Sequence, residues 1–212
     1  MRISGGSAKG RNVRIRRAFS TEGSPGELRP TSAKVRKAVF DILQDRLFHS
    51  RFVDLYAGTG AVGIEALSRG AAEVTFVESS SVRIRLIRDL ATKFLFDDRA
   101  RLVRDSALRF LQTSVADKAH GSACGSYDIV FADPPYCSEE IEKLLSVIGG
   151  ARMLKEGGTL IVEHPSKKLL PAVAGALSLL KVYRYGDTAL SVYRSCASAC
   201  DSVTEEVRDD DR

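Results

Sequence analysis

One glycine-rich loop constrains the fold of this chain more than any other feature. Residues 51–56 read as a buried strand, and Gly58-x-Gly60-x-x-Gly63 follows, before a helix over residues 61–68. Glycines in such a loop let the backbone turn tightly and approach a ligand closely. This order of strand, loop and helix is typical of a nucleotide-binding α/β domain, although the glycines could also serve the turn alone.

The remaining sequence continues the alternation of strands and helices. Strands are predicted over residues 51–56, 73–77, 101–104, 127–132 and 158–163, and helices over 61–68, 81–95, 106–111, 138–149 and 167–175. Such repeated units predict an α/β fold with a mostly parallel sheet covered on both faces. Two last strands, 177–185 and 188–194, flank Gly186-Asp187 and predict an antiparallel hairpin. A first helix, capped by Thr31 or Ser32, is expected to run to about residue 47.

Charge is distributed unevenly along the 212 residues. Residues 1–37 hold ten Lys and Arg against two acids, whereas residues 201–212 hold six acids and two arginines. We therefore expect a basic arm or hairpin over residues 1–30, one domain over 31–195 and an acidic, disordered tail over 196–212. The candidate phosphate-contacting residues are Arg11, Arg14, Arg16, Arg17, Arg29, Thr31 and Arg36.

Two alternatives accompany these basic residues. The arm could be a solvated segment without a ligand, and Arg36 could be a structural partner of an acid.

Several classes of protein are disfavoured. The chain has no run of about 18 apolar residues and no apolar N-terminal stretch, so neither a membrane span nor a secretory signal is expected. Its four cysteines form no Cys-x-x-Cys pair, and no histidine cluster accompanies them. Free thiols, no metal site and a cytoplasmic location are the plain reading.

The acids near the glycine loop indicate which ligand it binds. Glu78 ends the second predicted strand, 20 residues after Gly58, where a carboxylate can accept hydrogen bonds from ribose hydroxyls. That pattern also fits NAD. Asp54 argues against NAD, because a carboxylate just before the glycines would repel a pyrophosphate. The same charge favours the sulfonium and ammonium groups of S-adenosylmethionine.

A further acid, Asp105, follows the third predicted strand. It could accept the adenine amino group of the cofactor, cap the next helix, or do both. The expected cofactor-binding residues are Asp54, Tyr56, Ala57, Gly58, Thr59, Gly60, Gly63, Glu78, Ser79, Asp105 and Ser106.

A second motif, Asp133-Pro134-Pro135-Tyr136, follows the fourth predicted strand. Consecutive prolines fix two φ angles and supply no amide protons, so their carbonyls are held as acceptors. The Asp133 carboxylate and the Pro134 carbonyl could each bind one hydrogen of an exocyclic base amine and aim its lone pair at a methyl donor. Tyr136 offers a face on which a flipped base can stack. We expect these four residues to be catalytic, although the motif could be only a stiff turn.

Both motifs follow strands, and open α/β sheets bind ligands at the carboxyl ends of their strands. They should therefore face one crevice. Four functions fit to different degrees: an RNA methyltransferase, a DNA adenine-N6 methyltransferase, a noncatalytic RNA-binding factor and an NAD-dependent oxidoreductase. A DNA enzyme usually needs a recognition insert, for which the 75 residues between Gly58 and Asp133 leave no room.

Beyond these motifs, the chain resembles the bacterial family that methylates guanine N2 in the 16S RNA of the small ribosomal subunit. The resemblance covers residues 1–195. The matching segments are Gly5-Gly6, Gly10-Arg11, Arg29-Pro30-Thr31, residues 35–43, 54–60 and 63–71, Phe76-Val77-Glu78, Asp133-Pro134-Pro135-Tyr136 and Glu163.

The resemblance implies a Rossmann-like, class I S-adenosylmethionine-dependent methyltransferase fold with seven strands. It also implies a substrate amine held by Asp133 and Pro134, and an N-terminal arm that grips 16S ribosomal RNA in an assembled subunit. One departure is Asp89, where the family usually has Asn, and the loop over residues 113–126 is individual.

Overall fold

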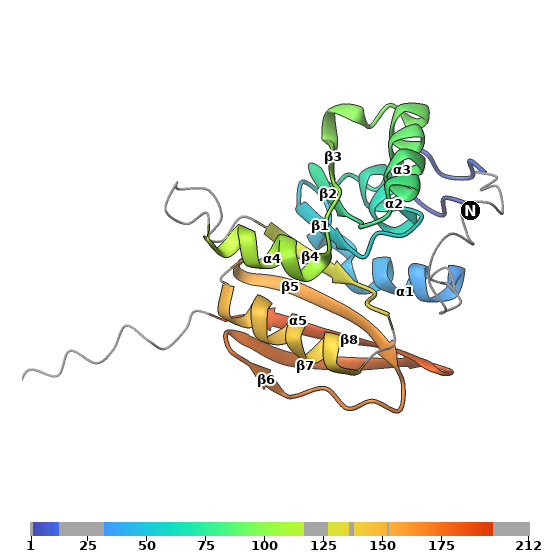
Figure 1. Ribbon diagram of the computed structural model, residues 1–212. Coiled ribbons are helices and arrows are strands. Elements are labelled where there is room, and N and C mark those ends of the chain that lie inside the picture. The colour runs from blue at the N-terminus through green and yellow to red at the C-terminus, as the bar shows by residue number, and fades with distance from the viewer. Residues whose placement is uncertain (1, 13–31, 117–126, 136–137, 152, 197–212) are drawn as a thin grey trace, which may run out of the picture.

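A single mixed sheet lies at the centre of the molecule (Figure 1). The structure is a computed structural model that describes residues 2–12, 32–116, 127–135, 138–151 and 153–196. The sheet has the strand order β3-β2-β1-β4-β5-β8-β7-β6. Its strands are β1 (Arg51–Leu55), β2 (Glu73–Val77), β3 (Ala100–Val103), β4 (Tyr127–Ala132), β5 (Leu154–Pro165), β6 (Val173–Ala174), β7 (Leu177–Tyr185) and β8 (Thr188–Ser195).

The first five strands are parallel, as the alternating pattern predicted. β1, β2 and β4 are buried along almost their whole length, which explains their nearly continuous apolar sequences. The strand order reverses between β1 and β4. On one side of this point lie β1, β2 and β3, and on the other side lie β4 and β5. Such a reversal leaves a crevice at the carboxyl ends of the strands, where open α/β sheets bind ligands.

Helices cover both faces of this sheet. One hydrophobic core packs α1, α2 and α3 against one face, and a second packs α4 and α5 against the other. None of the helices within the described ranges has both the length and the apolarity to cross a membrane. The helices are α1 (Ala33–Leu43), α2 (Ala61–Ser68), α3 (Ser81–Phe94), α4 (Ala107–Ala116) and α5 (Ser138–Ala151), with short 3₁₀ turns at Gln44–Arg46 and Asp97–Arg99.

The start of α1 confirms one of the two predicted caps. The Ser32 hydroxyl accepts a hydrogen bond from the Val35 amide at 3.1 Å, as expected of an N-cap residue. The helix ends at Leu43 and continues as the 3₁₀ turn Gln44–Arg46, so the predicted boundary near residue 47 is close to the observed one.

The predicted C-terminal hairpin is confirmed. β7 and β8 pair in antiparallel fashion around Gly186, whose φ of 64° suits glycine. β8 lies antiparallel between β5 and β7, from Thr159 opposite Arg194 to Pro165 opposite Thr188. The hairpin therefore extends the parallel part of the sheet beyond β5.

The helix predicted over residues 167–175 is wrong. This segment instead forms a turn and the two-residue strand β6, which pairs with β7 and makes the sheet eight-stranded rather than seven-stranded. Pro171 explains the error, since a proline inside a helix removes one hydrogen bond and disfavours helical geometry at the preceding residue. Its carbonyl accepts a hydrogen bond from the Tyr193 hydroxyl at 2.8 Å.

The first part of the predicted basic arm packs on α2. Residues 2–12 form the beginning of the expected hairpin, with an antiparallel bridge between Arg2 and Asn12. The Ser68 hydroxyl at the end of α2 accepts from the Ala8 amide at 2.9 Å and donates to the Gly5 carbonyl at 2.7 Å. The rest of the arm, residues 13–31, and the acidic tail beyond Cys196 lie outside the described residues.

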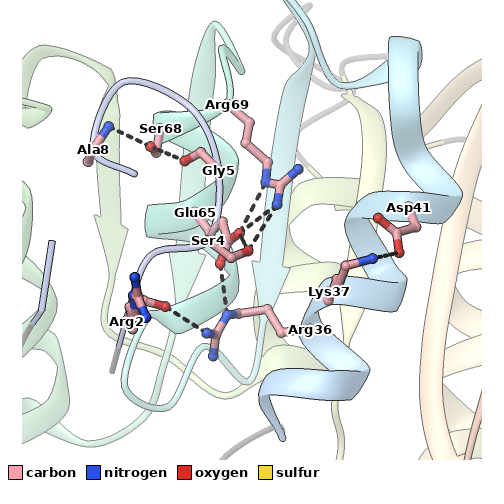
Figure 2. Close-up of polar contacts among 10 residues, drawn as sticks. All are labelled: Arg2, Ser4, Gly5, Ala8, Arg36, Lys37, Asp41, Glu65, Ser68 and Arg69. Carbon is pink, nitrogen blue, oxygen red and sulfur yellow. Dashed lines mark hydrogen bonds and ion pairs between the residues drawn. The ribbon is translucent and has the colours of Figure 1, made fainter. Parts of the chain in front are cut away.

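A buried ion-pair network joins this N-terminal segment to α1 and α2 (Figure 2). Glu65 of α2, whose side chain is 1% exposed, accepts from Arg36 Nε of α1 at 2.8 Å and from Arg69 Nη2 at 2.8 Å. It also accepts from the Ser4 hydroxyl, and Arg36 Nη2 donates to the Arg2 carbonyl at 2.9 Å.

The network corrects one expectation. Arg36 is buried and paired with Glu65, so it has the structural role that was the alternative to a phosphate contact.

We expect Glu65→Gln to lower the free energy of unfolding by about 3–5 kcal/mol, because it leaves the buried Arg36 and the partly exposed Arg69 without a compensating charge. A suitable control is Lys37→Gln, which breaks the exposed pair with Asp41 shown in the same view and should cost less than about 1 kcal/mol. Urea unfolding of both variants measures the difference. Equal losses would contradict the role assigned to Glu65.

Candidate active site

Four carboxyl groups lie at the carboxyl ends of four adjacent strands. Asp54 lies in β1, Glu78 directly follows β2, Asp133 directly follows β4, and Glu163 lies near the end of β5. The described residues contain no group of three or more His, Cys, Asp or Glu side chains arranged to hold a metal ion. The four acids line one edge of the sheet, at the point where the strand order reverses.

The register of the sheet places the two sequence motifs side by side. Leu55 pairs with Ala132, so the glycine loop after β1 lies next to the Asp-Pro-Pro turn after β4. Ala132 in turn pairs with Val162, which puts Asp133 and Glu163 at neighbouring positions of the two parallel strands. The expectation that the two motifs share one edge of the sheet is confirmed.

The glycine loop leaves its own backbone accessible. Tyr56, Gly58 and Gly60 have positive φ angles of 60°, 54° and 72°, and the loop is closed by a hydrogen bond from the Gly60 amide to the Ala57 carbonyl at 2.7 Å. A Cβ atom added to Gly58 would have no neighbour closer than 3.7 Å. A ligand can therefore approach the backbone at Gly58, next to the half-buried Thr59.

The later glycines of the motif serve packing. A Cβ atom on Gly63 would lie 2.2 Å from the ring of Phe76, and one on Gly60 would lie 2.8 Å from the side chain of Ile87. Gly63 thus lets α2 pack closely on β2, and Gly60 makes room for α3.

Glu78 fixes the conformation of the glycine loop. Its Oε2 atom accepts from the Gly58 amide at 2.9 Å, and its Oε1 atom accepts from the Ser80 amide at 2.8 Å and the Ser79 hydroxyl at 3.4 Å. Arg83 lies 3.5 Å away and offsets part of the charge. Because a carboxylate has about four acceptor positions, Glu78 can hold the loop and still accept a hydrogen bond from a ligand hydroxyl.

Asp54 is a buried acid with an altered pKa. Its Oδ2 atom accepts from the Gly63 amide at 2.9 Å. Burial, together with the charges of Asp133 and Glu78, raises the pKa of Asp54 to about 7, although the hydrogen bond from Gly63 acts in the opposite direction. Electrostatic coupling of Asp54 with Asp133 and Glu78 is further evidence that the acids share one site.

Tyr56 connects the glycine loop to α5. Its hydroxyl donates to Glu140 Oε1 at 2.8 Å, and Glu140 lies in the first turn of the helix that follows the Asp-Pro-Pro turn. Burial, and then the Glu140 carboxylate, raise the pKa of Tyr56. The side chain of Tyr56 is therefore engaged with α5, so a contact with a cofactor would come from its backbone.

Asp105 and Ser106 lie where β3 leads into α4. The Ser106 hydroxyl accepts from the Arg109 amide at 3.3 Å, which is the geometry of an N-cap. Asp105 accepts from the Ser106 amide at 2.8 Å and lies 3.7 Å from Arg109. Ser106, and not Asp105, therefore caps α4. The partly exposed Asp105 carboxylate remains accessible at this edge of the sheet.

The Asp-Pro-Pro turn is rigid at its centre. Pro134 is buried, whereas Asp133 is half-buried and Pro135 is exposed. The two prolines fix the backbone between β4 and α5. Tyr136, the expected stacking residue, lies outside the described residues.

Glu163 is the functional candidate that the motif analysis left without a role. It is 5% exposed, and its Oε2 atom has no hydrogen-bond partner within the described part of the chain. Burial, and then the Asp133 charge, raise the pKa of Glu163 to about 8. The available signal was an acid placed directly after the apolar run Leu160-Ile161-Val162.

Few of the expected RNA-binding residues can be placed. Arg11 is exposed, and its guanidinium carbon lies 5.8 Å from the centre of the Phe94 ring. The other candidates, apart from Arg36, lie outside the described residues: Arg14, Arg16, Arg17, Arg29 and Thr31.

Comparison with known proteins places the chain in a family. A family model described as Conserved hypothetical protein 95 matches residues 1–194. The chain belongs to this family. Ribosomal RNA small subunit methyltransferase D of Escherichia coli strain K12 is 33% identical over 195 residues, which cover 92% of this chain and 89% of that protein. The resemblance to a family of ribosomal RNA methyltransferases is confirmed.

Solved structures agree with the assignment of this chain to the family. The Escherichia coli protein yhhF is 31% identical and superposes with a TM-score of 0.74, covering 93% of this chain and 99% of that one. An RNA methyltransferase from Salinibacter ruber in complex with S-adenosyl-L-homocysteine has a TM-score of 0.59 at 12% identity, over 83% of this chain and 99% of that one, which shows a common fold. The predicted class I methyltransferase fold is confirmed.

We expect Asp54→Asn to stabilise the ligand-free protein at neutral pH. Between its ordinary value of 3.8 and about 7, Asp54 keeps its proton in the folded state and loses it in the unfolded state, so wild-type stability falls as pH rises through this window. Asparagine avoids that loss. The gain in free energy of unfolding of Asp54→Asn over wild type should be absent near pH 4. Above pH 7 it should exceed about 1 kcal/mol, or about 2–4 °C in Tm.

Thermal melting at a series of pH values measures this difference. The exposed Asp41→Asn serves as the control and should follow the wild-type profile. A constant difference between Asp54→Asn and wild type from pH 4 to pH 8 would contradict the shifted pKa.

Proposed function

We propose that this protein transfers a methyl group from S-adenosylmethionine to the exocyclic N2 amine of a guanine in 16S ribosomal RNA, within the small ribosomal subunit. One observation carries the proposal: the glycine loop and the Asp-Pro-Pro turn lie side by side at the same acid-lined edge of the sheet. Family membership supports ribosomal RNA as the substrate, because relatives such as the Escherichia coli methyltransferase D are named for it.

The residues at this edge fit the methyl donor. S-adenosylmethionine, when bound, supplies a methyl group on a positively charged sulfur atom. Asp54 and the neighbouring acids favour its cationic groups, whereas they would repel the pyrophosphate of NAD. Gly58 leaves space beside the backbone. Glu78 can accept hydrogen bonds from the ribose hydroxyls, and Asp105 can accept one from the adenine amino group. The backbone of Tyr56 to Thr59 with Ser79 and Ser106 would complete this subsite.

Asp133 and Pro134 act on the substrate. An exocyclic amine is a weak nucleophile because its lone pair is delocalised into the base. The Asp133 carboxylate and the Pro134 carbonyl can each accept one of its hydrogens and direct the lone pair toward the donor, so catalysis is mainly positioning. Pro135 stiffens the turn, and Tyr136 would stack on a base that has left its helix. The amine loses its proton after transfer, so this step needs no strong base.

Replacement of Asp133 should separate chemistry from cofactor binding. We expect Asp133→Ala to lower the methylation rate by at least about 100-fold, since one acceptor that orients the amine is lost. Affinity for S-adenosylmethionine, measured by calorimetry, should change little. Asp133→Asn, which keeps the shape and removes the charge, is the companion variant. Wild-type turnover in Asp133→Ala would exclude the proposed role. Wild-type turnover in Asp133→Asn, which keeps an acceptor oxygen, would show only that the negative charge is dispensable.

Three substrates distinguish the proposal from a DNA enzyme and from a noncatalytic factor. Incorporation of labelled methyl groups should be highest into small ribosomal subunits or their RNA, and absent from duplex DNA. Incorporation into DNA alone would favour the adenine-N6 reading, and binding of RNA without methylation would favour the noncatalytic one. Mass spectrometry of ribosomal RNA from cells with and without the protein then identifies the modified nucleotide.

The basic residues near the N-terminus are proposed to contact phosphates. Affinity for RNA should then fall steeply with salt, because each neutralised phosphate releases counterions. Arg11→Gln should reduce the slope of log affinity against log salt by about 1. Arg101→Gln removes the same charge from an exposed position of β3 and is the control. A salt slope near zero, or the same change in both variants, would contradict the contact.

A further inference from the structure

Glu163 is a buried acid with one carboxyl oxygen that no donor satisfies within the described part of the chain. It is 5% exposed, and its Oε2 atom has no hydrogen-bond partner among the described residues. A buried carboxyl that lacks a donor costs free energy, because no hydrogen bond replaces those it made with water. An unsatisfied oxygen beside the candidate active site indicates a hydrogen-bond donor that belongs to the ligand.

The surroundings of Glu163 explain why its Oε2 atom lacks a donor among the residues that the structure describes. Ile161, two residues earlier on the same face of β5, and Leu190, opposite it on β8, are both fully buried and apolar. Burial, and then the charge of Asp133 at the neighbouring position after β4, raise the pKa of Glu163. We therefore expect a donor to reach Glu163 from the side of Asp133, its neighbour across the strand pair β4 and β5.

We propose that Glu163 determines specificity for guanine by accepting a hydrogen bond from the ring N1–H group, while Asp133 holds the N2 amine. This inference rests on the proposed function. Neighbouring strands lie about 4.8 Å apart, so the carboxyl groups of Asp133 and Glu163 can converge on two adjacent N–H groups. The two acids would thus recognise the same edge of the base from two strands.

The chemistry of the bases supports guanine. The Watson–Crick edge of guanine presents two adjacent donors, N1–H and the N2 amine, and so matches two carboxylates. Adenine and cytosine present an amine beside a ring nitrogen that only accepts, and this nitrogen would face the lone pairs of a carboxylate. The positive charge of the methyl donor in the same crevice favours the ionised form of both acids. A site built to bind a donor rejects an analogue that lacks it.

The test compares guanine with 2-aminopurine, which carries the same exocyclic amine but has no hydrogen on N1. Both bases are placed at the target position of the small-subunit RNA, and methylation and binding are measured with wild type, Glu163→Gln and Glu163→Ala. We expect wild type to prefer guanine by about 10- to 100-fold. This preference should shrink at least about tenfold in Glu163→Ala, because guanine loses a partner and 2-aminopurine does not.

Controls separate recognition from stability. Tm and affinity for S-adenosylmethionine report whether each variant folds, and Ser191→Ala, on the opposite face of the neighbouring strand β8, serves as a matched buried control that should keep the wild-type preference. A wild-type preference of about 1, or a preference that stays unchanged when Glu163 is replaced, would overturn the inference. An absence of methylation with both bases in wild type would instead overturn the proposed function.

Discussion

The burial of carboxyl groups next to one another at one edge of the sheet is the constraint on which the rest of this structure depends. Asp54 and Glu163 lie in β1 and β5, and Glu78 and Asp133 directly follow β2 and β4. Burial, and then the neighbouring charges, raise the pKa values of Asp54 and Glu163 to about 7 and 8. Such an arrangement is unfavourable in the empty protein. It becomes favourable when a cation and hydrogen-bond donors enter, and both are properties of the proposed methyl donor and base.

The fold brings these acids together through general features of α/β sheets. The reversal of strand order between β1 and β4 opens the crevice, and the glycine loop brings bare backbone to its wall. The hydrogen bond from Tyr56 to Glu140 links the two motifs, because it connects the glycine loop with α5, the helix that follows the Asp-Pro-Pro turn. The Glu65 network fixes the N-terminal segment and α1 on α2, the helix that follows the glycine loop.

The sequence was informative where local chemistry decides the structure. Buried parallel strands read as apolar runs, and the glycine loop and the Asp-Pro-Pro turn carry their signatures in adjacent residues, so β1, β2, β4 and the shared edge were predicted. Pro171 shows the limit of periodicity, since one residue converts an expected helix into a turn. The role of Arg36 depends on its contact with Glu65, which is 29 residues away in the sequence. The role of Glu163 depends on the neighbouring strand β4. Their roles could not be read from the residues around them.

The most direct measurement is a structure of the protein with S-adenosyl-L-homocysteine and an RNA that contains the target guanine. We expect the cofactor to lie against Gly58, Glu78 and Asp105, and the guanine amine to lie within about 3.5 Å of an Asp133 oxygen and the Pro134 carbonyl oxygen. A cofactor bound away from the glycine loop, or a guanine amine that does not reach the Asp-Pro-Pro turn, would contradict this expectation.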